Sequence, residues 1–129
     1  MASIFSKIIA GEIPCHKIAE NDKFLAFLDI MPLKEGHTLV IPKKEVDYIF
    51  DLDDNLLSEI NLFARDVARK IEKAIPCKRI GVTVIGLEVP HSHIHLIPIN
   101  GVADMNFEKP KLKLSQERLA EIASLIRES

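Results

Sequence analysis

Residues 91–98 read HSHIHLIP and place three of the chain's five histidines at alternate positions. In a β-strand, alternate side chains project from the same face of the sheet. The stretch therefore predicts a strand that presents the imidazoles of His91, His93 and His95 on one side. Near neutral pH an imidazole can be a nucleophile, a proton donor or acceptor, or a metal ligand. The row thus predicts a chemically reactive surface.

Three explanations account for this row of imidazoles. Strand residues two apart are separated by about 6.5–7 Å, so His91 and His95 lie about 13 Å apart, and one zinc ion can be shared by a neighbouring pair at most. In nucleophilic catalysis one ring attacks while its neighbours orient it and bind charge. A half-buried strand with hydrogen-bonded structural histidines is the third explanation. Three histidines in register favour catalysis over the other two.

The composition indicates one soluble domain that works inside the cell. The chain has 129 residues, 47% of them apolar and 28% charged, which suits a single globular domain. No apolar run approaches the ~20 residues that cross a bilayer, and the N-terminus lacks the apolar core of a signal peptide. Cys15 and Cys77 are expected to be free thiols. A net charge of −2 argues against broad electrostatic binding of nucleic acid. We expect a cytoplasmic protein with no membrane or nucleic-acid partner.

Hydrophobic periodicity predicts an α+β fold. The terminal helix is expected after Ser115, and the long helix, capped by Asp53 or Asp54, has a single apolar stripe and so packs on a core. Short strands that follow one another in hairpins, together with one long helix, predict an antiparallel sheet with the long helix on one face. Residues 100–114 show no regular pattern. The expected strands are 17–20, 24–28, 37–41, 79–85 and 91–97, and the expected helices are 5–10, 53–74 and 115 onward.

The alternating histidines, followed by two apolar residues, resemble the signature of the histidine-triad (HIT) superfamily. Further stretches, in the same order along residues 3–98, resemble the motifs of its Hint branch, the nucleoside phosphoramidate hydrolases. The resemblance implies a single HIT domain over residues 1–129, with 100–129 as a C-terminal extension, and a homodimer whose five-stranded sheets join into a larger one. The matching stretches are IF (4–5), KIIAGEIP (7–14), LAFLDI (25–30) and GHTLVIPK (36–43).

The resemblance also implies a reaction. A HIT hydrolase of this branch cleaves the bond between the α-phosphate of a purine nucleotide and its leaving group, without a cofactor. His93 would be the nucleophile and form a nucleotidyl-histidine intermediate, with His91 and His37 orienting it. His95 would hydrogen-bond the phosphate and stabilise its developing charge.

The same resemblance implies a nucleotide pocket. Asp29 would accept hydrogen bonds from the ribose hydroxyls, which a carboxylate does well. Thr83, Glu88 and Val89 lie on the approach to the triad and would also contact the nucleotide. The apolar residues implied to form the base slot are Phe5, Ile13, Phe27, Leu28, Ile30 and Leu39.

Two of the chain's departures from the family pattern bear on metal binding and on the leaving group. Ser3, Ser6 and Glu45 stand where zinc-binding members carry two cysteines and a histidine, so we expect no metal. Glu88 stands where the Hint branch has a hydroxyl residue linked to the leaving group, and an ionised carboxylate there would repel phosphate. Glu88 can instead protonate a departing amine, recognise a cation or face solvent.

Three alternative functions therefore stay open beside the phosphoramidase. They are a dinucleoside polyphosphate hydrolase, a low-turnover nucleotide-binding or scaffolding dimer, and a small metalloenzyme that uses a histidine pair.

Overall fold

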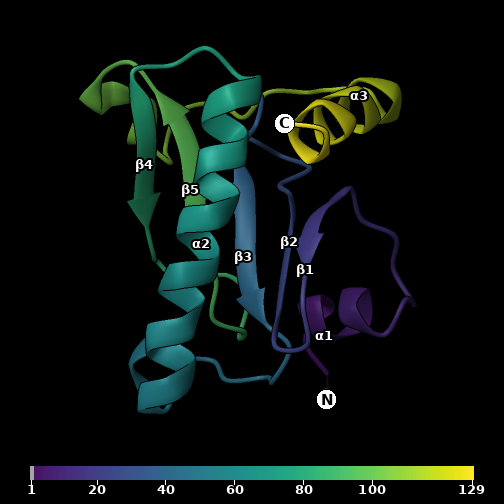
Figure 1. The fold of residues 1–129 in the computed structure, drawn as a ribbon, viewed down its shortest axis with the longest axis vertical. Helices are drawn as coiled ribbons and strands as arrows, with labels where there is room; N and C mark the ends of the chain where they lie inside the picture. The colour runs from purple at the N-terminus through teal and green to yellow at the C-terminus, as the bar shows by residue number, and fades with distance from the viewer. Residues whose placement is uncertain (1) are drawn as a thin grey trace.

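A five-stranded antiparallel sheet forms the centre of the fold (Figure 1). The computed structural model describes residues 2–129, so Met1 lies outside the described residues. The strands lie in the order β1-β2-β3-β5-β4, and every neighbouring pair is antiparallel. The predicted α+β class with five antiparallel strands is confirmed. The strands are β1 (Lys17–Glu20), β2 (Phe24–Leu28), β3 (Thr38–Pro42), β4 (Arg79–Thr83) and β5 (Ile94–Ile99).

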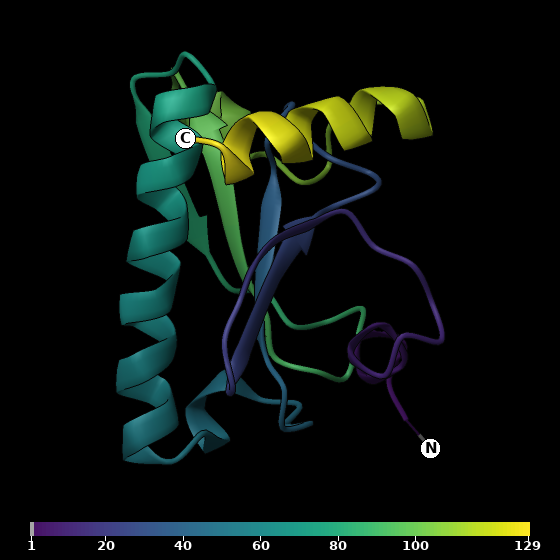
Figure 2. The ribbon, with the colours of Figure 1, turned by 45° about the vertical axis from the view of Figure 1, so that its right-hand side comes forward.

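Helices cover the two faces of the sheet unequally. The long helix α2 (Asp54–Ala74) and the terminal helix α3 (Gln116–Arg127) pack on one face, and the short α1 (Ile4–Ile9) lies on the other (Figure 2). Asp53 and Ser115 cap α2 and α3 as expected, each accepting a hydrogen bond from a backbone N–H of the first turn. Two 3₁₀ helices, η1 (Ile49–Asp51) and η2 (Val102–Met105), lie in the connections. Within residues 2–129, none of the helices has both the length and the apolarity that a membrane span requires.

The alternation of side chains along the strands separates two cores. Val40 and Leu96 point toward α2 and α3, whereas Phe27 and Leu39 point toward α1. Strand β2 is buried along its whole length because both of its faces are covered. Since α1 is only six residues long, it covers its face incompletely, and a cavity remains between α1 and the sheet.

The strand that carries the histidines begins later than expected. We predicted it over 91–97, but β5 spans Ile94–Ile99 and continues through Pro98, which pairs with Ile80 of β4. The pairing of β3 with β5 ends opposite Leu96. Pro98 can therefore lack an amide hydrogen without breaking a β3–β5 hydrogen bond.

The other element boundaries shift by one or two residues. The strand expected over 37–41 spans Thr38–Pro42, the one over 79–85 stops at Thr83, and the first helix ends at Ile9. Residues 100–114 are irregular apart from η2.

Candidate active site

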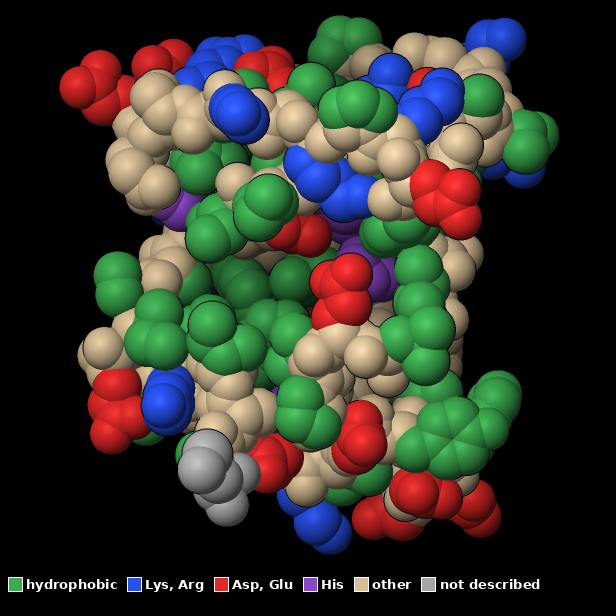
Figure 3. Space-filling model, turned by 180° about the vertical axis from the view of Figure 1, so that it is seen from behind, with side chains coloured by type: hydrophobic (Ala, Val, Ile, Leu, Met, Phe, Trp, Pro, Cys, Tyr) green, Lys and Arg blue, Asp and Glu red, His purple; other side chains and the backbone are tan. Residues whose placement is uncertain are grey.

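The cavity between α1 and the sheet has a volume of about 240 Å³. In Figure 3 the corresponding hollow is lined by apolar side chains, with acidic, basic and histidine side chains at its rim. Of the predicted site residues outside the base slot, Asp29, Glu88, Val89, His93 and His95 line it. All six residues predicted for the base slot line it as well: Phe5, Ile13, Phe27, Leu28, Ile30 and Leu39.

Four further lining residues escaped the sequence analysis: Ile4, Ile8, Pro14 and Cys15. Ile4 and Ile8 lie one helical turn apart on α1, so they share a face. That spacing was the available signal for these two. Pro14 and Cys15 follow α1 in the connection to β1, where no periodicity marks them.

The sheet register builds the floor of the cavity. Phe27 on β2 lies opposite Leu39 on β3, and Leu39 lies opposite His95 on β5. Directly opposed residues share a face of the sheet, so the three side chains form one row facing α1. Thr83 on β4 continues the row opposite His95, but it is not among the cavity-lining residues. Its contact with a nucleotide stays a prediction.

The three triad rings lie on the α1 side of the sheet. The Phe5 ring packs edge-on against His91 and His93, with ring centroids 5.8 and 5.1 Å apart, and the His93 and His95 centroids are 4.9 Å apart. Ser92, between His91 and His93, instead borders a separate cavity beside η1. The rings therefore share a side as expected, although the regular strand begins only after His93.

A backbone carbonyl fixes the proton on the His93 ring. Its Nδ1 lies 2.8 Å from the carbonyl oxygen of His91, and a carbonyl can only accept a hydrogen bond. In the neutral ring the proton is therefore on Nδ1, and Nε2 presents a lone pair. His93 lines the cavity, so this nitrogen can attack an electrophile bound there.

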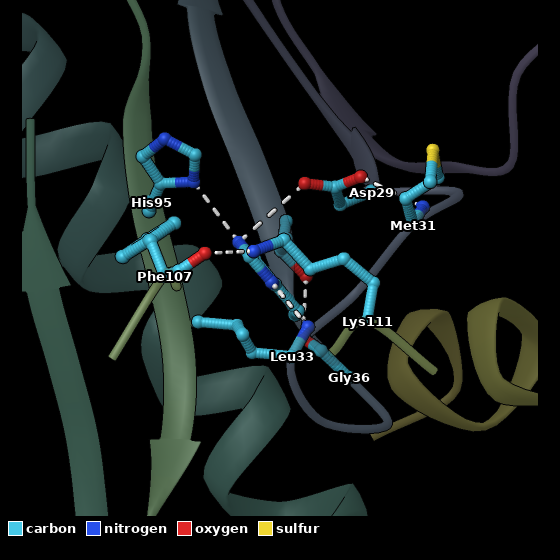
Figure 4. A network of polar contacts seen from close by, with 9 residues as sticks. Asp29, Met31, Leu33, Gly36, His95, Phe107 and Lys111 are labelled. Carbon is cyan, nitrogen blue, oxygen red and sulfur yellow. Dashed lines mark hydrogen bonds and ion pairs between the residues drawn. The ribbon is translucent and has the colours of Figure 1, made fainter. Parts of the chain in front are cut away.

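A chain of hydrogen bonds fixes the His95 ring in the opposite tautomer (Figure 4). The Leu33 N–H donates to Nδ1 of His37 at 3.1 Å, so the proton of the neutral His37 ring is on Nε2. That nitrogen lies 2.9 Å from Nδ1 of His95 and donates to it. The proton of His95 is then on Nε2, where it can be donated to a bound oxyanion.

Burial keeps these two rings neutral. Burial lowers the pKa of His37 to about 3, with contributions from His95, Lys111 and His93. Burial, with contributions from His93 and Lys111, also lowers the pKa of His95 to about 4. His37 does not line the cavity. It hydrogen-bonds to Nδ1 of His95, which does line the cavity.

His91 is buried in a second hydrogen-bond network. Its Nε2 donates to the carbonyl of Pro42 at 2.7 Å, so its Nδ1 accepts from the Ser3 hydroxyl at 2.8 Å. Glu45 Oε1 accepts from the Ser3 backbone N–H at 2.7 Å and from the Ser6 hydroxyl at 2.6 Å. These bonds lower the pKa of Glu45 to about 2. The network holds His91, whose carbonyl in turn orients His93.

This donor set does not fit a structural zinc ion. Zinc sites use thiolates and unprotonated imidazole nitrogens, whereas Ser3 and Ser6 offer hydroxyls. The Nδ1 atom of His91 already accepts a hydrogen bond from Ser3. The Glu45 oxygen that faces the serines already accepts two hydrogen bonds. Hydrogen bonds thus connect Ser3, Ser6 and Glu45, the positions at which the family resemblance implies zinc ligands.

A different cluster brings together three groups that could each supply one metal ligand, namely Asp29, His37 and His95. The nitrogen of His37 that faces the other two carries a proton, because its second nitrogen accepts the Leu33 N–H. A protonated nitrogen cannot bind a metal ion. The hydrogen-bond chain therefore accounts for this cluster, and the absence of a metal stays a prediction.

Asp29 lies between the apolar cavity and the His37–His95 pair. One carboxylate oxygen accepts the Met31 N–H at 2.9 Å, and the other lies 3.7 Å from Nε2 of His37. Burial raises the pKa of Asp29, and the Met31 N–H, His93 and Lys111 oppose that rise. The carboxylate keeps acceptor capacity toward the cavity, as a diol-binding group requires.

Comparisons with known proteins agree with this geometry. The HIT domain model matches residues 10–101. The chain belongs to the HIT family. An adenosine 5'-monophosphoramidase of Schizosaccharomyces pombe is 39% identical over 76% of this chain and 74% of its own length. Family membership therefore supports hydrolase activity and nucleotide binding in the family.

Two solved HIT structures share the fold closely. A Hit-like protein of Bartonella henselae, whose crystal structure holds an unknown ligand, superposes with a TM-score of 0.84 at 34% identity, covering 98% of this chain and 95% of that one. A zinc-bound histidine triad family protein of Mycobacterium smegmatis has a TM-score of 0.81 at 26% identity, covering 99% and 92%.

Proposed function

We propose that the protein is a nucleotide hydrolase that cleaves the bond between the α-phosphate of a purine nucleotide and its leaving group. His93 Nε2 attacks phosphorus, the leaving group departs, and water then releases the nucleoside monophosphate from the nucleotidyl-histidine. The observation that carries the proposal is the pair of opposite tautomers, with a lone pair on His93 Nε2 and a proton on His95 Nε2. A nucleophile thus lies beside a donor for the developing negative charge.

The cavity supports a nucleoside monophosphate unit as the bound group. Its apolar walls suit a base, and Asp29 supports binding of the ribose diol beside the histidines. The monophosphoramidase relative supports an adenosine nucleotide as the first substrate to test.

Glu88 favours an amine over a polyphosphate as the leaving group. Glu88 lines the same cavity as His93, and Asp29 adds a second carboxylate. An ionised carboxylate repels the additional charges of a polyphosphate chain, whereas it tolerates a neutral amine or attracts a cationic one. This charge pattern favours phosphoramidates over dinucleoside polyphosphates.

We also propose a homodimer formed along β4. This strand lies at the edge of the sheet, where backbone groups lack a partner strand. Exposed apolar side chains gather at this edge. Val82 lies on β4 and Ile85 just after it, and Tyr48 and Phe50 lie on the segment before α2. A second copy would extend the sheet and cover these side chains.

The direct test is turnover of an adenosine phosphoramidate by wild type and by His93→Ala. We expect the substitution to lower kcat by more than about 10³-fold, because the attacking group is lost, while AMP still binds. Rapid quenching of wild type followed by intact-protein mass spectrometry should trap AMP on the chain, and His93→Ala should trap none.

The matched control is His16→Ala. His16 hydrogen-bonds Gln116 and does not line the cavity, so its loss should leave turnover unchanged. Wild type that binds AMP but cleaves neither phosphoramidates, acyl-adenylates nor diadenosine polyphosphates would overturn hydrolysis in favour of a binding dimer. Equal turnover by His93→Ala and wild type would overturn the assigned nucleophile.

A further inference from the structure

The irregular segment after β5 returns to the histidine cluster. The Leu112 N–H donates to the Pro32 carbonyl at 2.8 Å, and Asp104 forms a 3.0 Å ion pair with Lys34. Between these two anchors, the Phe107 ring packs edge-on against His95, with centroids 4.8 Å apart. The segment is therefore fixed to the body of the protein on both sides of its contact with the site.

Lys111 is the cation that this segment brings to the site. Its positive charge contributes to the lowered pKa values of His37 and His95 and opposes the rise in the pKa of Asp29, and Figure 4 draws its side chain in the same cluster as the labelled His95 and Asp29. The ammonium donates to the carbonyl of Phe107 and lies 5.4 Å from the centroid of that ring. Among residues 2–129, no carboxylate lies within 4.0 Å of it. Two of its three donors are thus available to another acceptor.

The lining of the cavity, within the described residues, contains acidic side chains and lacks a lysine or arginine that could bind a phosphate. Its lining includes the carboxylates of Asp29 and Glu88 but, among residues 2–129, no lysine or arginine. A nucleotide phosphate brings further negative charge to these groups. Lys43 is paired with Glu20 at 2.8 Å, and Lys44 lines a different cavity. Lys111, which contacts Phe107 beside His95, lies where a cation can balance these negative charges.

We propose that Lys111 is a phosphate-binding residue of this hydrolase. In the free protein its ammonium is held on Phe107; with substrate bound it donates to an oxygen of the phosphate that His95 also contacts. The inference rests on the proposed function and assigns a role to the C-terminal segment. Lysine suits this role because its flexible stem carries a compact charge with three rotatable donors.

The test compares the binding of AMP and adenosine by calorimetry in wild type, Lys111→Met, Lys111→Arg and the matched control Lys113→Met. Lys111→Met should weaken AMP binding about tenfold, near the low end for a hydrogen bond to a charged group because the side chain is partly exposed. Adenosine, which lacks the phosphate, should bind with unchanged affinity. Lys111→Arg should retain most of the AMP affinity. Lys113 is an exposed lysine of the same segment, so Lys113→Met should bind AMP and adenosine as wild type does.

Other results would refute either the role of Lys111 or the proposed hydrolase, and the two cases can be distinguished. If Lys111→Met weakens AMP and adenosine equally, the segment only shapes the pocket, and phosphate binding by Lys111 is refuted. If Lys111→Met and Lys113→Met bind AMP equally well, the inference falls while turnover by wild type still upholds the proposed hydrolase. If wild type binds AMP with the Lys111 dependence but cleaves no substrate, the hydrolase falls and the phosphate-binding role stands.

Discussion

Replacing Ser3 with alanine should destabilise the fold through the network beneath the triad. The Ser3 side chain is buried, accepts the Ser6 N–H at 3.0 Å as the cap of α1, and bonds Nδ1 of His91 at 2.8 Å. Loss of a helix cap costs about 1 kcal/mol, and a buried acceptor left unpaired costs about 1–3 kcal/mol. The free energy of unfolding should therefore fall by about 2–4 kcal/mol, within the stability of an ordinary domain.

Urea unfolding followed by circular dichroism measures this loss. Ser6→Ala is the matched control, since the Ser6 hydroxyl bonds only the exposed Glu45 and its backbone N–H still reaches the cap. Ser3→Thr, which keeps a hydroxyl, should recover most of the stability. We also expect kcat to fall more than KM rises in Ser3→Ala, because the His91 carbonyl that orients His93 is less firmly held. Equal losses of stability in Ser3→Ala and Ser6→Ala would refute the reasoning.

Three further predictions concern the backbone, pH and assembly. Gly36 has φ +95°, and an added Cβ would lie 3.1 Å from two neighbouring side chains. Gly36→Ala should therefore lower the free energy of unfolding by about 1–3 kcal/mol. Gly101→Ala, whose Cβ would meet no atom within 4 Å, is the control, and equal melting temperatures of the two variants would contradict the prediction. The pKa values of His37 and His95 are lowered to about 3 and 4, so the unfolded chain binds more protons below about pH 6.5. The urea midpoint should therefore fall between pH 7 and pH 5, and a flat midpoint would contradict neutral, buried rings. Phe50→Glu introduces a charge at the proposed dimer surface and should yield monomers in sedimentation velocity. A variant that stays dimeric would contradict β4 as the interface.

Most of the fold was predictable from the sequence because the spacing of apolar residues marks the buried faces of the helices and strands. The helical stripe that ends at Ala74 and the caps Asp53 and Ser115 predicted α2 and α3 closely. Boundaries were less predictable at His91 and Pro98. A strand ends or continues according to which neighbour it pairs with, and the alternation of residue types does not contain that information.

The site was predictable in part for the same reason. Alternation placed the triad rings on one side of the sheet, whereas the apolar wall residues were implied by the resemblance to the HIT superfamily. The role of Ser3, however, depends on a partner 88 residues away in the chain. The contact of Phe107 with His95 likewise had no periodic signal, because the segment that carries it is irregular.

Residue order alone determined the element types, the shared side of the imidazoles and the set of chemical groups available, since these follow from side-chain periodicity and composition. Only the tertiary structure decided which nitrogen of each ring carries its proton. That choice is made by acceptors and donors from other strands and loops, such as the Leu33 N–H for His37. It also decided that Lys111 lies near the histidines, because chain packing places Phe107, which Lys111 contacts, against the His95 ring.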